Sequence, residues 1–272
     1  MLKLMYITND PQVAQIADHA GVDRIFIDLE TVGKELRQGG MNTVQSHHST
    51  DDVRRIRAVL ENAGLLVRVN PIYDGTETEI HTVIENGADL LMLPYFQNAE
   101  QVQTFLRYVD HRAKTVLLVE TPEAVEHLDE ILALDGIDEC YIGLNDLHLG
   151  YKKKFMFELL ADGTVDRIAD QCKRRGIPFG FGGIARIGQG TLPAERILAE
   201  HIRIGSEAVI LSRSFCNADL IRDYDRIGQL FATEIRRMRE TETALHLESA
   251  SYFEQNRAAV QKIVHAITES IE

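Results

Sequence analysis

One local pattern recurs along the 272-residue chain and limits the folds open to it: a stretch with helical periodicity ends at a glycine, and a short apolar run follows almost at once. A glycine just past a helix end usually takes the left-handed conformation that caps the helix, and a short β-rich apolar run is typical of a buried strand. The pattern occurs at Gly21, Gly64, Gly87, Gly136, Gly176 and Gly205. We therefore expect helices and buried strands to alternate.

Eight such runs are candidate strands, and each is followed by a segment with helical periodicity. They span residues 3–7, 24–29, 65–69, 89–93, 114–119, 139–143, 178–181 and 207–211. Alternating strands and helices predict a parallel sheet. Eight repeats in a chain of this length favour closure into a (β/α)8 TIM barrel. An open doubly wound sheet is the alternative.

The pattern changes after residue 216, where two helical segments follow without a further strand. Each places apolar residues on one face, as Ile227, Phe231 and Ile235 do in the first segment and Val260 and Val264 do in the second. We expect residues 1–216 to form the barrel core and residues 217–272 to form additional C-terminal helices. These helices pack either on their own barrel or on a neighbouring subunit of a homo-oligomer.

Composition and charge restrict the partners. The formal net charge of −13 repels phosphate backbones, so we expect no nucleic-acid partner. No run approaches the ~18 apolar residues of a membrane span, and the N-terminal apolar run is too short for a signal peptide. The three widely spaced cysteines indicate neither a disulfide framework nor a zinc knuckle. We expect a cytoplasmic protein with no membrane partner.

Two carboxylates follow neighbouring candidate strands, at the barrel end where active sites of this fold lie. Glu120 comes directly after the apolar residues 117–119, and Asp146 follows residues 141–145. Adjacent strands are ~4.8 Å apart, so both side chains can reach one cation. Oxygen ligands with open positions suit Mg2+ or Mn2+. A structural salt bridge at the barrel mouth explains the same spacing equally well.

Arg68 lies within an apolar strand, between Val67 and Val69. A guanidinium in such a place requires an anionic partner. That partner is either a substrate oxygen or Glu30, and the spacing alone slightly favours the structural pair with Glu30.

Taken in order, several of these motifs resemble the HpcH/HpaI aldolase and citrate lyase family, which has a pyruvate-kinase-like barrel. The matching stretches are residues 21–30, 66–70, 87–94, 119–124 and 142–147. The resemblance implies a class II-type aldolase, a carbon–carbon lyase that uses Mg2+ or another divalent cation such as Mn2+ or Co2+. Its small-molecule 2-oxo acid substrate would be cleaved or formed through a pyruvate-like enolate.

The resemblance also implies roles for individual positions. Glu120 and Asp146 match the metal-binding acids of the family, and Arg68 matches its catalytic arginine beside the keto or enolate oxygen. The backbone of Gly143, Leu144 and Asn145 resembles the turn that holds a substrate carboxylate.

The general base is not specified by these motifs. Aldolases of the family carry a histidine directly after the acidic residue that follows the second strand, whereas this chain has Thr31 there. We take His48 as the candidate catalytic residue. The alternatives are His47, a metal-bound water, and a purely structural role in which Ser49 or Thr50 caps the following helix.

Two features beyond the seventh and eighth strands bear on ligands. Gly182 and Gly183 belong to a G-x-G-x-x-A pattern that falls outside a first βαβ unit, which argues against a nicotinamide cofactor. We expect them to follow the seventh strand in a tight turn. Arg213, after the eighth strand, is a candidate for binding a phosphate or a distal hydroxyl group.

Two other functions are compatible with the same residues. One is an acyl-CoA ester lyase of the citrate lyase beta-subunit type, which shares the glutamate, aspartate and arginine. The other is a barrel that binds a metabolite without catalysis.

The position of the lysines gives a first testable prediction. A Schiff-base aldolase requires a desolvated lysine inside the barrel mouth, but Lys114 begins its strand at the opposite end. Borohydride treatment in the presence of pyruvate should therefore leave no covalent adduct, and EDTA should abolish activity. An adduct formed by an enzyme that stays active in EDTA would contradict the metal-dependent class.

Overall fold

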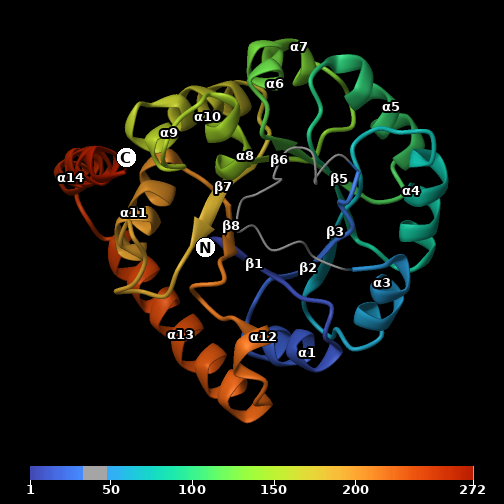
Figure 1. Cartoon of the computed structure of the whole chain (residues 1–272), viewed down its shortest axis with the longest axis horizontal. Helices are drawn as coiled ribbons and strands as arrows, with labels where there is room; N and C mark the ends of the chain where they lie inside the picture. The colour runs from blue at the N-terminus through green and yellow to red at the C-terminus, as the bar shows by residue number, and fades with distance from the viewer. Residues whose placement is uncertain (33–47, 272) are drawn as a thin grey trace.

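The computed structural model describes residues 1–32 and 48–271, and within them eight parallel strands close into a barrel (Figure 1). Each strand pairs with the next along the chain, and the eighth pairs with the first. This closure confirms the predicted (β/α)8 barrel over the open doubly wound sheet.

The strands agree with the apolar runs to within one residue at every boundary except the end of the seventh. They are β1 (Lys3–Ile7), β2 (Arg24–Asp28), β3 (Gly64–Arg68), β4 (Leu90–Leu93), β5 (Lys114–Val119), β6 (Glu139–Ile142), β7 (Phe179–Ile184) and β8 (Ala208–Leu211).

Helices surround the barrel on its outer side (Figure 1). They are α1 (Pro11–His19), α3 (Thr50–Arg57), α4 (Thr76–Glu85), α5 (Ala99–Val109), α6 (Pro122–Glu126), α7 (Leu128–Ile131), α8 (Leu144–Gly150), α9 (Glu158–Ala161), α10 (Thr164–Arg174), α11 (Ala194–Ile204), α12 (Ala218–Ile221), α13 (Tyr224–Leu245) and α14 (Ala250–Ser270).

The predicted cap glycines behave as expected with one exception. Gly64 is the first residue of β3 and does not take a positive φ. The connection before it needs no glycine cap, because the buried carboxylate of Asp18 accepts hydrogen bonds from the amides of Glu61, Asn62 and Ala63. The others have positive φ: Gly21, Gly87, Gly136, Gly176 and Gly205.

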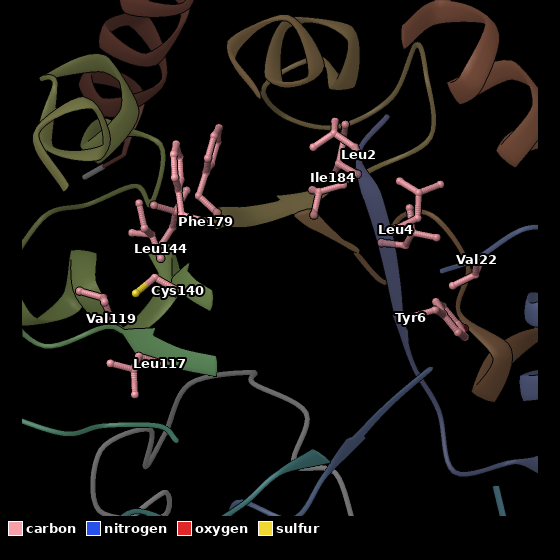
Figure 2. Packing of buried hydrophobic residues seen from close by; sticks show 14 of the residues in the cluster. Leu2, Leu4, Tyr6, Val22, Leu117, Val119, Cys140, Leu144, Phe179 and Ile184 are labelled. Carbon is pink, nitrogen blue, oxygen red and sulfur yellow. The ribbon is translucent and has the colours of Figure 1, made fainter. Parts of the chain in front are cut away.

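Alternation along the strands separates two cores. On β5, Leu117 and Val119 belong to the large layer between strands and helices, part of which is drawn in Figure 2. Val116 and Leu118 belong to the small core inside the barrel. The next inward position on this strand is residue 120, so the period of two directs the Glu120 carboxylate into the barrel mouth.

A buried ion pair spans the N-terminal end of the barrel. Arg24 begins β2 and Glu139 begins β6, on opposite sides of the barrel, and their side chains form two hydrogen bonds of 2.7 and 2.6 Å. Lys3 lies 3.6 Å from the same carboxylate. Burial opposes ionisation of Glu139, but the hydrogen bonds and charge of Arg24 hold its pKa below the ordinary value. The charges at this end are therefore matched.

The glycine-rich seventh strand departs from its prediction. Gly182 and Gly183 lie inside β7, where a bulge shifts the register with β8, and they do not form a turn after it. The Tyr141 hydroxyl donates to the carbonyl of Gly182 and accepts from the amide of Ile210. A side chain at Gly180 would meet the Tyr141 ring at 2.7 Å. Gly180 thus makes room for a tyrosine whose hydroxyl bridges β7 and β8 at the bulge.

Both C-terminal helices pack on their own barrel (Figure 1). Helix α13 contacts α1 and α11, and α14 contacts α11 and α9. The fully buried Asn256 of α14 donates to Glu200 of α11 at 2.8 Å. Within the described residues, no helix is long and apolar enough to cross a membrane. Contact of this tail with a second subunit stays a prediction.

The ion pair at the N-terminal end gives a stability prediction. Glu139→Gln should lower the free energy of unfolding by about 3 kcal/mol, because it strands the buried Arg24 charge. Replacing both residues with methionine should restore most of this loss. Denaturant unfolding measures both changes, and Glu207→Gln, at a half-exposed partner of Lys3, is the control expected to change stability by less than about 0.5 kcal/mol.

The pH dependence of that loss follows from the lowered pKa. The contribution of Glu139 should be complete above about pH 5 and should disappear as the pH falls through its lowered folded-state pKa. Equal stability of wild type and Glu139→Gln at neutral pH would contradict the assigned role of the pair.

Candidate active site

Arg68 occupies the centre of the barrel mouth, at the end of β3. Its Nε and Nη2 atoms donate to the two carboxylate oxygens of Asp28 at 2.9 and 2.8 Å, and Nη2 lies 3.3 Å from Glu30 Oε2. The guanidinium carbon is 5.8 Å from the centre of the Phe26 ring. Although burial opposes its charge, Asp28 and Glu30 raise the pKa of Arg68 further, so it stays protonated.

Asp28 is the principal partner of Arg68 and was missed in the sequence. The sequence favoured Glu30, and the structure retains Glu30 as the second partner. Asp28 and Arg68 are direct neighbours in the β2–β3 register, so both side chains leave the sheet on the same face. The signal was available, because Asp28 is two residues beyond the inward-facing Phe26.

One nitrogen of Arg68 points to a role beyond this ion pair. Among the described residues, no oxygen accepts a hydrogen bond from Nη1, whereas Nε and Nη2 are held by Asp28. The guanidinium is therefore fixed along one edge and retains donors on another.

Glu120 follows β5 and is buried, with 3 % of its surface exposed. Its Oε1 accepts from the Tyr95 amide at 3.0 Å. Tyr95 has a left-handed φ of 50°, which costs a non-glycine residue about 1 kcal/mol. Burial and the neighbouring charge of Asp146 raise the pKa of Glu120 well above its ordinary value, and Arg68 opposes them.

Gly143 brings the end of β6 against this glutamate. A Cβ at this position would lie 2.8 Å from Glu120 Cβ and 2.9 Å from Oε2, so only glycine permits the contact. The Gly143 amide donates to Val119 at 3.0 Å, and α8 starts at the next residue. Half-buried Asp146 lies in the first turn of that helix, and its charge acts on Glu120. The two predicted metal ligands, Glu120 and Asp146, therefore lie on the two segments that meet at Gly143.

Four acidic residues contribute to the described part of the mouth. Asp28, Glu30 and Glu120 act on the charge of Arg68, and Asp146 acts on Glu120. Carboxylates buried in this way require cationic compensation, and hard oxygen donors suit a divalent cation. Over the described part of the chain, no group of three or more His, Cys, Asp or Glu side chains forms a metal-ligand set.

His48 reaches the mouth beside Asp28. Its Nδ1 accepts a hydrogen bond of 3.0 Å from the Asp28 amide, so the neutral ring carries its proton on Nε2. For His48 to accept a proton as a base, its ring must first release that amide. His47 lies outside the described residues.

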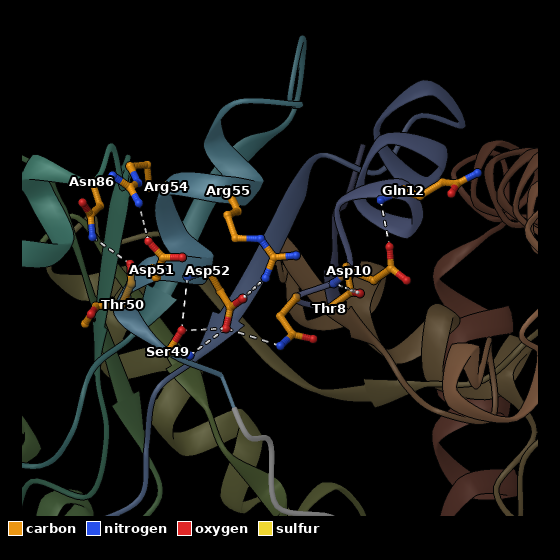
Figure 3. Close-up of polar contacts among 11 residues, drawn as sticks. Thr8, Asp10, Gln12, Ser49, Thr50, Asp51, Asp52, Arg54, Arg55 and Asn86 are labelled. Carbon is orange, nitrogen blue, oxygen red and sulfur yellow. Dashed lines mark hydrogen bonds and ion pairs between the residues drawn. The ribbon is translucent and has the colours of Figure 1, made fainter.

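The segment after His48 also caps α3, as the structural alternative predicted (Figure 3). Ser49 is the N-cap: its hydroxyl accepts from the Asp52 amide at 3.4 Å, and the Asp52 carboxylate accepts from the Ser49 amide at 2.8 Å. Asn9 and Arg55 contact the same carboxylate. A capping function and a position for His48 at the mouth therefore coexist.

Arg213 lies in the exposed turn that follows β8. Strand β8 is three strands from β5 around the closed barrel, so Arg213 and Glu120 follow strands that are not neighbours.

The fold and the mouth define a (β/α)8 barrel with an acidic, arginine-centred active-site end. The family model described as HpcH/HpaI aldolase/citrate lyase matches residues 3–180, and the chain belongs to this family. The sequence resemblance is thereby confirmed, and the protein is a lyase that acts on carbon–carbon bonds.

Two relatives with assigned activities are aldolases. The chain is 29 % identical over 204 residues to a hydroxypyruvate/pyruvate aldolase of Roseobacter denitrificans, covering 60 % of this chain and 72 % of that one. It is 24 % identical to a 2-dehydro-3,6-dideoxy-6-sulfogluconate aldolase of Pseudomonas putida, over 62 % of this chain and 72 % of the relative.

Solved structures share the fold. A HpcH/HpaI aldolase/citrate lyase family protein of Burkholderia cenocepacia superposes with a TM-score of 0.63 at 16 % identity, covering 83 % of this chain and 94 % of that one.

The raised pKa of the buried Glu120 carboxylate gives a testable prediction about stability. Glu120→Gln should raise the stability of the metal-free protein at neutral pH, because a folded-state pKa above the ordinary value means that the ionised carboxylate destabilises the fold. Because the folded-state pKa is raised, wild type loses stability as the pH rises through it, and the two proteins should converge under acid. Thermal unfolding without metal measures the difference.

The exposed substitution Glu130→Gln serves as the control and should leave stability unchanged. A Glu120→Gln protein less stable than wild type at neutral pH would show that the carboxylate is compensated within the folded chain.

Proposed function

We propose that this enzyme is a divalent-metal-dependent aldolase that cleaves or forms a 2-oxo acid, with Glu120 and Asp146 as the metal ligands. The observation that carries the proposal is the close approach of Gly143 to Glu120, which brings the first turn of α8, with Asp146, beside this carboxylate. The family is generally dependent on divalent metals, and the oxygen donors here fit Mg2+, Mn2+ or Co2+. When bound, the cation would supply electrostatic stabilisation of negative charge on the substrate oxygens.

Arg68 acts on the same developing charge. Asp28 fixes the guanidinium along its Nε edge, which leaves Nη1 to donate to the keto oxygen of the substrate. Cleavage of the C3–C4 bond leaves its electron pair on the pyruvate-like half as an enolate, and the C4 hydroxyl loses its proton as the aldehyde forms. A donor already oriented toward the oxygen stabilises this charge more than it stabilises the ground state.

The first turn of α8 is proposed to bind the substrate carboxylate. The amides of Leu144 and Asn145 are at its first two positions, where no carbonyl of the helix itself can accept their hydrogen bonds. Gly143 leaves this turn open beside Glu120. Arg213, in the turn after β8, would contact a polar group at the distal end of the substrate.

His48 stays the proposed base for the C4 hydroxyl proton. Its ring lies at the mouth, and the hydrogen bond to the Asp28 amide ties it to the residue that orients Arg68. Removal of the ring by His48→Ala should lower kcat with little change in the affinity for metal.

We also propose a cytoplasmic homo-oligomer. Three buried free cysteines suit a reducing compartment. Leu220 and Leu247, in and after the C-terminal helices, are 79 % and 86 % exposed, which favours their burial against a second subunit.

Activity should depend on both carboxylates and on the arginine. With a panel of 2-oxo-4-hydroxy acids and Mg2+, Mn2+ or Co2+, wild type should release pyruvate, measured by a coupled dehydrogenase assay. Glu120→Gln, Asp146→Asn and Arg68→Lys should each lower kcat by about 100-fold or more. Arg54→Lys, at an exposed arginine, is the control.

The outcomes separate the candidate activities. Release of an acetyl-CoA-type product from a CoA ester, without pyruvate release, would replace the aldolase proposal with the acyl-CoA lyase alternative. Full activity in the presence of EDTA would contradict the proposed dependence on a divalent metal.

A further inference from the structure

Asn70 lies two residues beyond Arg68 and is buried, yet the proposed chemistry does not use it. Its carboxamide oxygen accepts hydrogen bonds from the amides of Thr31 at 2.8 Å and Val32 at 2.9 Å. These amides belong to the segment that leaves β2. Asn70 therefore joins the ends of β2 and β3 above the sheet, where their ladder has finished.

Glu79 of α4 fixes the orientation of this carboxamide. Its Oε1 accepts from Asn70 Nδ2 at 2.7 Å, and its Oε2 accepts from the Asn70 backbone amide at 3.3 Å. The Nδ2 group must face the carboxylate and the oxygen must face the two amides, so only one orientation satisfies every contact. Glu79 is itself 8 % exposed, which makes an unmade hydrogen bond costly here.

These contacts hold Glu30 from both sides. The Glu30 amide donates to Asp28 Oδ1 at 3.2 Å, and the peptide that follows Glu30 donates its N–H to Asn70. The side chain between these two anchors is 1 % exposed and places Oε2 3.3 Å from Arg68 Nη2. Glu79 of α4 is thus connected to Glu30 through Asn70 and the Thr31 amide, and Glu30 in turn contacts Arg68.

We infer that Asn70, oriented by Glu79, is a positioning residue that holds Glu30 against Arg68 and so sets where the guanidinium meets the substrate oxygen. This inference rests on the proposed function, in which Arg68 stabilises charge on that oxygen. An error of about 1 Å in such a group can cost up to about 100-fold in rate. The effect belongs to kcat, because the charge develops only in the transition state.

The chain contains a matched pair remote from the mouth. Asn256 of α14 donates through Nδ2 to Oε1 of Glu200 at 2.8 Å, and both residues are almost completely buried. This pair shares the carboxamide-to-carboxylate hydrogen bond of Asn70 and Glu79 but lies between two helices on the outside of the barrel, where Arg196 and Arg203 also contact it. A substitution in this pair should affect stability alone, so comparison with it shows whether a substitution at Asn70 also affects the position of Arg68.

The test compares Asn70→Asp, Glu79→Gln, the double variant and Asn256→Asp by steady-state kinetics with Mn2+ and by thermal unfolding. Asn70→Asp places two carboxylates together and should lower kcat about tenfold, with KM within about twofold. The double variant exchanges donor and acceptor, since the carboxamide introduced on α4 can donate to the carboxylate introduced after β3, and should regain most of the lost kcat. Asn256→Asp should lower the melting temperature but keep kcat.

Each result bears on one of the two proposals. Equal kcat in Asn70→Asp and Asn256→Asp, or a double variant no better than the worse single one, would overturn the inference while an active wild type upholds the lyase. Wild type without activity in any metal would overturn the proposed function, and the positioning role would fall with it. If Asn70→Asp does not fold, Glu79→Gln decides: an unchanged kcat rejects the inference, and a lowered kcat at unchanged KM supports it.

Discussion

The charge of Arg68 is the constraint on which the C-terminal end of this barrel depends. A largely buried guanidinium at the end of a barrel strand requires an anionic partner. Asp28 meets it from the neighbouring strand in direct register, and Glu30 approaches from the next inward position. The arrangement of the segment after β2 follows from this requirement, because Glu30 can reach Arg68 only if the chain turns where Asp28, Asn70 and His48 hold it.

The two ends of the barrel handle charge in opposite ways. At the N-terminal end, Arg24 and Glu139 satisfy one another across the barrel, and the pair serves to close it. At the mouth, burial and the charge of Asp146 raise the pKa of Glu120, and the charge of Arg68 opposes this shift only in part. A salt-bridged pair stabilises a fold, whereas carboxylates with shifted pKa values are typical of functional sites. This contrast supports the proposal that the chemistry takes place at the C-terminal end of the barrel.

Glycine at the mouth serves close approach more than flexibility. Gly143 admits the Glu120 carboxylate, and Gly180 admits the Tyr141 ring whose hydroxyl bridges the bulge in β7. Replacing either glycine would press a side chain into a neighbour under 3 Å away, so the contacts of the site and of the barrel interior limit the sequence at these positions.

The sequence by itself determined the barrel, because strand periodicity, helix-ending glycines and strand number are local properties that repeat eight times. It also predicted that Glu120, Asp146 and Arg68 lie at the C-terminal end of the barrel, since the ends of buried strands converge there in this fold. It did not find Asp28 as the partner of Arg68, the capture of Thr31 by Asn70, or the bulge that keeps Gly182 within β7. Each of these depends on how two neighbouring strands are paired, and that pairing exists only in the tertiary structure. Only the tertiary structure decided which charged side chains pair, as Asp28 does with Arg68.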